Sequence, residues 1–530
     1  MRTFQHPGRS PVFAENGMCA TSHPLAAKVA VTMLEQGGNA VDAAMAGAFM
    51  LGLCEPAMTG LGGDLFALIK PAGDPRITGL NGSGRAPAGL DPRALRAAGH
   101  KRMPGTDAAA VTVPGAVDAL CRMSEDFGMK GLDEVLAPAI HYAEHGVPIA
   151  PRVARDWDLN QARLQGAARD FYLWHGTTPP QTGMLFRHPR QAQVLRRIAA
   201  EGRAGFYQGE VAEDMVASLR ALGGCHTAED FAATACDHVE PICGSYRGVD
   251  LVELPPNGQG ATAILMANML AEFDLAAMDP LGLDRAHLEV EAAKLAYDAR
   301  NRFLADPAHT APDRLAHMLD PATARALAAL IDPDRALPDV AATSEGVHRD
   351  TVYITVVDRD RMAVSLICSI FSAFGSGLAS DRFGILFHNR GSGFTLEPGH
   401  PNEAGGGKRP MHTIIPAMLK RQGRLDMSFG VMGGQYQSCG HARFVSNLVD
   451  YGMDPQAAID APRLFPEPGE GLRIEAGYAD AVRQGLADKG HTLQPVPLGI
   501  GGAQAIRIDH EHGVLEGGSD PRKDGCALGY

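Results

Sequence analysis

The sequence lacks any C-x-x-C pair, and its nine cysteines are an odd number scattered along the chain. That distribution argues against a disulfide framework, and we expect the cysteines to be small apolar residues in a reducing compartment. The opening stretch MRTFQHPGRSPVF has no apolar run and no small-residue cleavage site, so no secretory signal is evident. We therefore predict a cytoplasmic protein.

An excess of positive charge is also missing. The chain has 48 basic and 61 acidic residues and a net charge of −13. Nucleic acids and anionic membranes attract clustered Lys and Arg, so we expect neither as a partner. The longest apolar run, 43–54, is too short to span a bilayer and predicts a buried helix. With 45% hydrophobic and 21% charged residues, the chain is globular.

Metal and cofactor motifs are absent too. There is no H-E-x-x-H, and 405–409 (GGGKR) lacks the Ser or Thr of a phosphate loop. Residues 60–63 lack the glycine spacing of a dinucleotide site. Residues 509–513 (DHEHG) fall where a strand turns over, so we predict a solvated turn there and no metal or organic cofactor.

At about 150 residues per domain the length suggests three or four units, with one large α/β unit left open. The pattern predicts helices over 22–36, 39–53 and 284–303, and a mostly helical region over 115–235. Strands are predicted over 65–69 and 77–80, and further strands near 383–388, 412–420 and 425–432.

The segment 308–350 is polar and rich in Pro and Asp, which predicts an exposed linker or processing region. Directly after it, 351–357 and 362–369 have the composition of two strands, with a turn at 358–361. We predict a β-hairpin that begins at the end of the linker.

Thr351 stands at this junction. A threonine hydroxyl is a poor nucleophile unless a base lies within hydrogen-bond reach, and a free α-amino group on the same residue, with a pKa of about 7.7–8, can be that base. Cleavage of the Asp350–Thr351 bond would create such an amine. A threonine that begins a strand is nevertheless commonplace, so this feature alone does not decide.

A series of motifs runs in order along nearly the whole chain: GMCATSHPLAAKVAVTMLEQGGNAVDAA (17–44), LGGDLF (61–66), PPNGQG (255–260), KLAYDARNRFLADP (294–307), DTVYITVVDRDRMAVSL (350–366), GKRPMHTIIP (407–416), GVMGG (430–434) and GSDPRKDG (518–525). Each is weak alone, but the ordered set resembles the γ-glutamyltranspeptidase family of N-terminal-nucleophile hydrolases.

The resemblance implies an α+β fold, a four-layer αββα sandwich with two stacked antiparallel sheets flanked by helices. Family members cut themselves before the catalytic threonine, which implies a large chain of 1–350 and a small chain of 351–530 in one interleaved heterodimer. Cleavage would fall between Asp350 and Thr351. Whether heterodimers associate further into a homo-oligomer is left open.

The resemblance also implies roles for individual residues. Gly433 and Gly434 match the glycine pair whose N–H groups form the oxyanion hole, and glycine permits close approach of the substrate. Ser369 matches the hydroxyl that orients the nucleophile. Arg85 matches the arginine that holds the substrate α-carboxylate, for which a guanidinium fork is suited.

Other positions depart from the family pattern. The acid that grips the substrate α-ammonium is replaced by Ser392, and an asparagine is replaced by Phe371. The paired serines after KRP are His412 and Thr413, and a position usually Gln or Glu is Arg390. A charged ammonium buried without an acid partner is costly, so glutathione should bind poorly.

These departures favour a small amide substrate with a nearby carboxylate and no α-ammonium, as in the oxamate amidohydrolase branch. The alternatives are a γ-glutamyltransferase or glutathione hydrolase, a β-lactam-type acylase, and an unprocessed binding protein. Only six residues, 402–407, lie between Pro401 and Lys408, where many relatives have a longer lid. We therefore expect hydrolysis to be favoured over transpeptidation.

Overall fold

Two seven-stranded antiparallel sheets form the centre of the protein in this computed structural model, which describes residues 8–338, 351–467 and 469–530. In spatial order, the first sheet contains β1 (Val12–Ala14), β18 (Val514–Ser519), β17 (Gly502–Asp509), β13 (Arg424–Met432), β12 (Ala417–Arg421), β9 (Val249–Glu253) and β8 (Ile242–Tyr246). The second contains β19 (Cys526–Gly529), β2 (Met18–Thr21), β10 (Val352–Val357), β11 (Ala363–Ser369), β3 (Asp64–Lys70), β4 (Thr78–Gly82) and β7 (Asp237–Val239).

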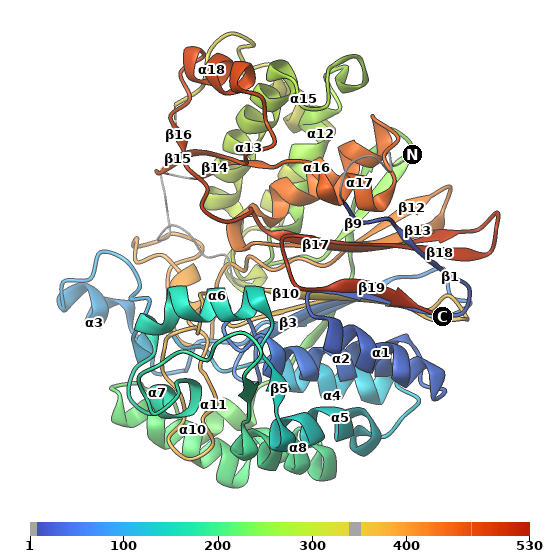
Figure 1. Ribbon diagram of the computed structural model, residues 1–530. Coiled ribbons are helices and arrows are strands. Elements are labelled where there is room, and N and C mark those ends of the chain that lie inside the picture. The colour runs from blue at the N-terminus through green and yellow to red at the C-terminus, as the bar shows by residue number, and fades with distance from the viewer. Residues whose placement is uncertain (1–7, 339–350, 468) are drawn as a thin grey trace.

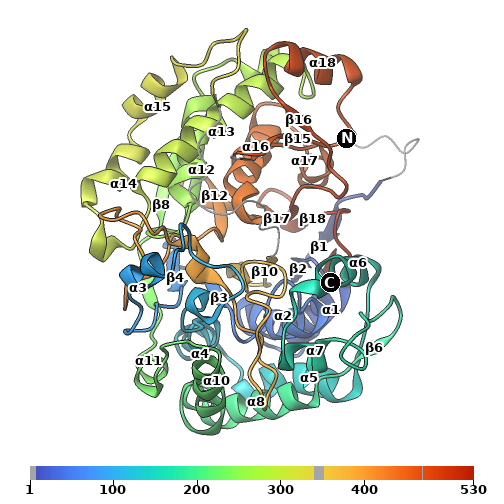
Figure 2. The same ribbon diagram turned by 90° about the vertical axis from the view of Figure 1, so that its left-hand side faces the viewer.

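Helices cover the outer face of each sheet (Figures 1 and 2). Beside the second sheet lie α1 (Pro24–Glu35), α2 (Ala40–Cys54), α4 (Ala116–Phe127), α5 (Leu132–His145) and α8 (Pro189–Glu201). Beside the first lie α12 (Gly260–Leu270), α13 (Leu283–Phe303) and α16 (Gln437–Val449). A separate buried cluster that includes Phe66, Tyr353 and Ile506 fills the space between the sheets. The expected four-layer αββα sandwich is confirmed.

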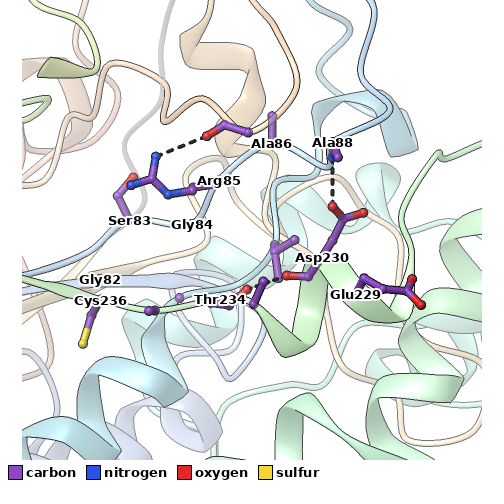
Figure 3. A pocket seen from close by; sticks show the side chains of 15 residues that line it. Gly82, Ser83, Gly84, Arg85, Ala86, Ala88, Glu229, Asp230, Thr234 and Cys236 are labelled. Atoms are coloured by element: carbon purple, nitrogen blue, oxygen red, sulfur yellow. Dashed lines mark hydrogen bonds between the residues drawn. The ribbon is translucent and has the colours of Figure 1, made fainter. Parts of the chain in front are cut away.

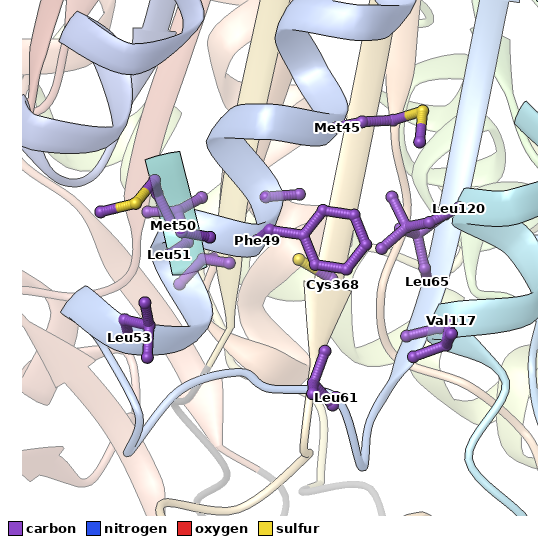
Figure 4. Close-up of a cluster of buried hydrophobic side chains, with 14 of the residues drawn as sticks. Met45, Phe49, Met50, Leu51, Leu53, Leu61, Leu65, Val117, Leu120 and Cys368 are labelled. Atoms are coloured by element: carbon purple, nitrogen blue, oxygen red, sulfur yellow. The ribbon is translucent and has the colours of Figure 1, made fainter. Parts of the chain in front are cut away.

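Helix α2 shows how sequence determines the layer nearest the hairpin. Asn39 caps the helix by accepting hydrogen bonds from the N–H groups of Val41 and Asp42, while Asp42 accepts one from Asn39. Every residue of α2 is buried, as its long apolar run predicts. Figure 4 shows Phe49 directed toward Leu120 and Cys368. This helix packs against β10 and β11 and so fixes the hairpin from below.

The predicted hairpin is present as β10 and β11, in register from Val352 opposite Cys368 to Val357 opposite Ala363. Its outer neighbours are β2, which pairs with β10, and β3, which pairs with β11. Because β2 and β3 come from the first 70 residues, the hairpin lies in the middle of a sheet that distant parts of the chain build together.

The prediction of an exposed linker or processing region over 308–350 is wrong in part. Residues 312–328 form two helices, α14 (Pro312–Leu319) and α15 (Pro321–Ala328), which bury Met318 and Ala324 against the α12 layer. A proline at the first helical position starts each helix, and Asp320 caps α15. The Pro and Asp residues are therefore helix-start signals. Residues 339–350 lie outside the described part.

The strand expected near 383–388 is also wrong. This segment is a buried loop with a single bridge between Ala379 and Leu386. Gly377 and Gly384 have positive φ angles of 76° and 66°, which turn the chain back on itself and prevent an extended run. The apolar side chains fill the helix layer beside α7 instead of a sheet.

The remaining expectations on local structure hold, apart from boundaries. The strand at 412–420 begins only at Ala417, after Pro416, and 509–513 is an exposed turn between β17 and β18. The other elements are α3 (Pro92–Ala97), α6 (Pro151–Asn160), α7 (Ala167–Tyr172), α9 (Ala204–Tyr207), α10 (Gly209–Ala221), α11 (Ala228–Ala232), α17 (Pro455–Asp460), α18 (Asp480–Asp488), β5 (Val147–Pro148), β6 (Leu185–Phe186), β14 (Leu464–Glu467), β15 (Gly471–Ile474) and β16 (Leu493–Gln494). Among the described residues, no helix has the length and apolar character that crossing a bilayer requires.

Candidate active site

Thr351 lies directly before β10, between the two sheets, and is 1% exposed. Its Oγ1 donates a 3.4 Å hydrogen bond to Ser369 Oγ, at the end of the neighbouring strand β11. Ser369 Oγ also accepts a 2.8 Å hydrogen bond from the Phe371 N–H. The hairpin therefore places a threonine hydroxyl beside a serine hydroxyl that the backbone holds in position.

Asp64 extends this pair across the sheet, because it lies opposite Ser369 in the β3–β11 ladder. Its Oδ1 accepts hydrogen bonds from the N–H groups of Gly84 (3.0 Å) and Gly115 (3.2 Å). A Cβ on Gly84 would lie 1.6 Å from the Val113 carbonyl oxygen, so only glycine fits this approach. Asp64 is fully buried at the start of a strand that is apolar from Leu65 to Ile69.

Two histidines and one arginine surround the Asp64 carboxylate. His412 Nε2 lies 3.0 Å from Oδ2, His388 Nδ1 3.5 Å and Arg390 Nε 3.9 Å. Burial raises the pKa of Asp64, but these three neighbours outweigh it and lower the pKa to about 2. Asp64 is therefore an ionised carboxylate in the protein interior.

His412 is neutral and held in one tautomer. Its Nε2–H donates to Asp64 and its Nδ1 accepts from the Ile414 N–H over 3.3 Å. Burial, reinforced by the charge of Arg390, lowers the pKa of His412 to about 3, although Asp64 opposes the shift. The ring lies 4.6 Å from that of Phe66, centroid to centroid.

Arg390 links the predicted substrate-binding positions to one another. Its Nη1 donates a 3.0 Å hydrogen bond to Thr413 Oγ1, and its guanidinium carbon lies 4.1 Å from the centre of the Phe371 ring. Phe371 has a positive φ of 77°, which turns its ring onto the guanidinium while its N–H stays on Ser369. Burial lowers the pKa of Arg390 to about 9, against the opposing effect of Asp64.

Gly433 and Gly434 follow β13, where the turn η6 (Gly434–Tyr436) leads into α16. The first N–H groups of a helix have no intrahelical acceptor, so this junction presents backbone donors. Gly433 has a φ of 131°, a conformation that favours glycine. The Gln259 amide joins this turn to the Thr413 segment by donating to the carbonyl oxygens of Thr413 (2.7 Å) and Gly434 (2.9 Å).

Ser392 lies in the same turn as Arg390, η5 (Arg390–Gly393). Its Oγ donates a 3.2 Å hydrogen bond to the Pro104 carbonyl oxygen. The position that holds the ammonium-binding acid in the family pattern thus carries a hydroxyl bonded to a neighbouring loop.

Among the described residues, the Arg85 side chain makes no hydrogen bond or ion pair with this group. Its guanidinium is half-exposed, at 46%, and contacts Asp306 (3.4 Å), Asp237 (3.8 Å) and the Gly407 carbonyl oxygen (3.2 Å). Arg85 lines a cavity of about 300 Å³ together with Ser83, Asp230 and Cys236 (Figure 3).

A group with metal-ligand spacing lies elsewhere, where α13 meets the segment after α18. The ligand atoms of His287, Glu291 and His491 lie within 4.8 Å of one another. Lys294 Nζ, however, is 3.0 Å from Glu291 Oε1, and His287 Nδ1 is 2.9 Å from His491 Nε2. An ammonium and a histidine–histidine hydrogen bond already occupy the space that a cation would need.

Of the predicted site residues, the structure brings together Thr351, Ser369, Phe371, Arg390, His412 and Thr413, with Gly433 and Gly434 joined through Gln259. Asp350 lies outside the described residues. Asp64, His388 and Gln259 were not predicted from the sequence as site residues. The signal available for Asp64 was an acidic residue at the head of a strand with no polar partner nearby.

Comparison with known proteins agrees with this geometry. The γ-glutamyltranspeptidase family model matches residues 26–530. The chain is 36% identical to the glutathione hydrolase-like YwrD proenzyme of Bacillus subtilis, covering 98% of this chain and 99% of the relative. It is 33% identical to the oxamate amidohydrolase proenzyme of Klebsiella pneumoniae, with 97% and 98% coverage.

Among solved structures, the cephalosporin acylase from Bacillus halodurans superposes with a TM-score of 0.92 at 36% identity, covering 100% of this chain and 99% of that one. Sequence and structure therefore match over the full length, and the relatives are hydrolases of one kind. The chain is an enzyme of the γ-glutamyltranspeptidase family of N-terminal-nucleophile hydrolases.

Proposed function

We propose that this enzyme cuts itself between Asp350 and Thr351 and then hydrolyses a small, carboxylate-bearing amide, with oxamate as the model substrate. The observation that carries the substrate class is the pair of neighbours in η5. Ser392 offers no acid for an α-ammonium group, and Arg390 brings a buried positive charge instead. The 33% identity to an oxamate amidohydrolase supports the same class.

In the proposed self-cleavage, the Thr351 hydroxyl attacks the Asp350 carbonyl carbon. The peptide C–N bond breaks, an ester forms at Thr351 Oγ1, and the Thr351 amine is freed. Water then hydrolyses the ester and regenerates the hydroxyl. The hydrogen bond to Ser369 keeps the hydroxyl oriented for the first attack.

For turnover, the freed Thr351 amine takes the hydroxyl proton as Oγ1 attacks the substrate amide carbon. The N–H groups of Gly433 and Gly434 stabilise the oxyanion, since donors fixed before the reaction need no reorganisation. The tetrahedral intermediate collapses with protonation and loss of ammonia. Water attacks the acyl-enzyme in the same way and releases the acid.

The cellular location proposed for this chemistry is the cytoplasm. All nine cysteines are free thiols in the structure, which is the state that a reducing compartment maintains.

Two measurements test the proposal. Denaturing intact mass of the wild type should give fragments of 350 and 180 residues, and Thr351→Ala should give one uncut chain of 530. Ammonia release should then be faster from oxamate than from glutamine or γ-glutamyl-p-nitroanilide. The reverse order of rates would refute the substrate class, and an uncut wild type would refute the mechanism.

A bulky-amide acylase is a second candidate, because the cephalosporin acylase superposes over the full chain and the loop at 402–407 is short. Side-by-side assay of oxamate and a cephalosporin amide separates the two. A binding protein that stays uncut is a third reading, and the intact-mass measurement addresses it.

A further inference from the structure

Arg390 is a buried charge with open hydrogen-bonding capacity. Its side chain is 0% exposed, and the one hydrogen bond of its guanidinium goes from Nη1 to Thr413 Oγ1. Nε and Nη2 have no hydrogen-bond partner among the described residues. Since an arginine carries five N–H donors and buried donors are normally satisfied, this side chain is arranged for an acceptor that is not part of the protein.

Asp64 does not fill that need. Its Oδ2 is 3.9 Å from Arg390 Nε, beyond hydrogen-bond length. Its oxygens already accept from the N–H groups of Gly84 and Gly115 and from His412. Asp64 therefore balances the charge of Arg390 while Nε and Nη2 of the guanidinium stay available.

The free donors lie close to the nucleophile. The Phe371 ring covers one face of the guanidinium at 4.1 Å, and the Phe371 N–H is bonded to the serine oxygen that accepts from Thr351. One residue thus contacts both the guanidinium and the partner of the nucleophile. We therefore infer that an anion held by Arg390 belongs to a group near the carbon that Thr351 attacks.

Arg85 differs in each of these respects. It is half-exposed, and two carboxylates and a carbonyl oxygen already surround its guanidinium. A second anion there would face Asp306 and Asp237 at close range. The position that the family pattern assigns to the carboxylate is therefore already occupied by acceptors of the protein itself.

We propose that Arg390, and not Arg85, receives the substrate carboxylate, and that it selects small amides whose carboxylate is bonded directly to the scissile carbonyl carbon or lies one carbon away. Planar N–H donors of a guanidinium match a carboxylate in a way that an ammonium does not. This inference rests on the proposed amidohydrolase function and adds the residue that sets its specificity.

The test compares oxamate with oxamide, in which a neutral carboxamide replaces the carboxylate. In Arg390→Gln we expect kcat/KM for oxamate to fall by about 100-fold relative to oxamide, the size of a lost charged hydrogen-bond pair. Arg390→Lys keeps the charge opposite Asp64 but loses the planar donors, so the ratio should fall by about 10-fold. Arg85→Gln should leave the oxamate-to-oxamide ratio within about 3-fold of wild type, whatever it does to either rate alone.

The intact mass of each variant identifies those that fold and cleave. If Arg390→Gln does not fold or cleave, Arg390→Lys is used for the comparison with wild type. A ratio that collapses in Arg85→Gln and survives in both Arg390 variants would overturn the inference and leave the proposed function standing. A wild type that hydrolyses γ-glutamyl amides but not oxamate, and whose Tm oxalate does not raise, would overturn both. A rise in the Tm of the wild type with added oxalate, absent in Arg390→Lys, would support the inference without a measurement of turnover.

Discussion

His412 Nε2–H donates a 3.0 Å hydrogen bond to Asp64 Oδ2, and the two residues are 348 positions apart in the chain. This contact joins the start of β3, in the second sheet, to the segment that leads into β12. It brings a negative charge next to Ser369, the residue whose hydroxyl accepts a hydrogen bond from Thr351. The interior of the site is therefore a charged cluster whose members depend on one another.

Asp64→Asn should destabilise the protein strongly. An amide cannot supply the charge that balances Arg390, and loss of one partner from a buried charged group typically costs about 3–5 kcal/mol. We expect a Tm several degrees lower, read by thermal denaturation of the purified enzyme. The matched control is Asp74→Asn, whose exposed carboxylate pairs with Arg76 and should not change the Tm. Equal Tm values for the two variants would contradict the role of Asp64.

Stability should fall on acidification below pH 6.5, and His23 contributes to this fall. Its Nδ1 accepts from the Leu25 N–H at the start of α1, and burial lowers its pKa to about 4. Between pH 6.5 and 4 the unfolded chain binds a proton that the folded protein does not, so the free energy of unfolding decreases as pH falls. From His23 alone, the free energy of unfolding should be about 2 kcal/mol lower at pH 5 than at neutral pH.

His23→Asn keeps a capping acceptor without a titrating group, so the Tm difference between pH 7 and pH 5 should shrink. His512, fully exposed beside Asp509, has a raised pKa, and His512→Asn should not shrink that difference. An undiminished difference in His23→Asn would show that other groups govern the acid response.

Water should outcompete acceptor amines in this enzyme. The short loop at 402–407 is held against the chain near Ala86, whose N–H donates to the Lys408 carbonyl oxygen and whose carbonyl oxygen accepts from the Gly407 N–H. Because the loop is only six residues long, we expect it to provide little cover over an acyl-enzyme. We expect product analysis with glycylglycine present to give mainly the free acid, and substantial transfer product would count against an open site.

Metal removal should have no effect. At the group formed by His287, Glu291 and His491, the Lys294 ammonium already supplies a positive charge. Dialysis against EDTA should leave activity and Tm unchanged, and added Zn²⁺ should not raise the Tm. An EDTA-sensitive Tm that Zn²⁺ restores would show that a cation displaces the ammonium.

Local sequence patterns predict much of this fold. The capped apolar helix α2 and the β10–β11 hairpin follow from residues close together in the chain. The same local reasoning failed at 312–328, where Pro and Asp begin helices, because those residues favour turns and helix starts alike. At 383–388 the apolar composition was right for a buried segment, but glycine geometry decided its shape.

The site was less predictable because its key contacts join residues far apart. Arg85 matches a motif, yet its partner Asp306 lies 221 positions away and determines what the guanidinium can still bind. The local sign of Asp64 is an acidic residue at the head of a strand, which does not show that glycine N–H groups from two other loops hold the carboxylate. Motifs identify candidate site residues, but only the tertiary packing shows which of their charged groups can still bind a ligand.

The order of strands in the second sheet has a consequence for the mature enzyme. β10 lies between β2 and β11, and β2 also pairs with the C-terminal strand β19, so strands from before residue 350 flank and separate those from after it. After the proposed cut before Thr351, neither fragment could leave without breaking the ladder around that residue. Isotope-labelled and unlabelled enzyme, mixed after maturation, should therefore keep their original pairs of fragments until the temperature reaches that of global unfolding.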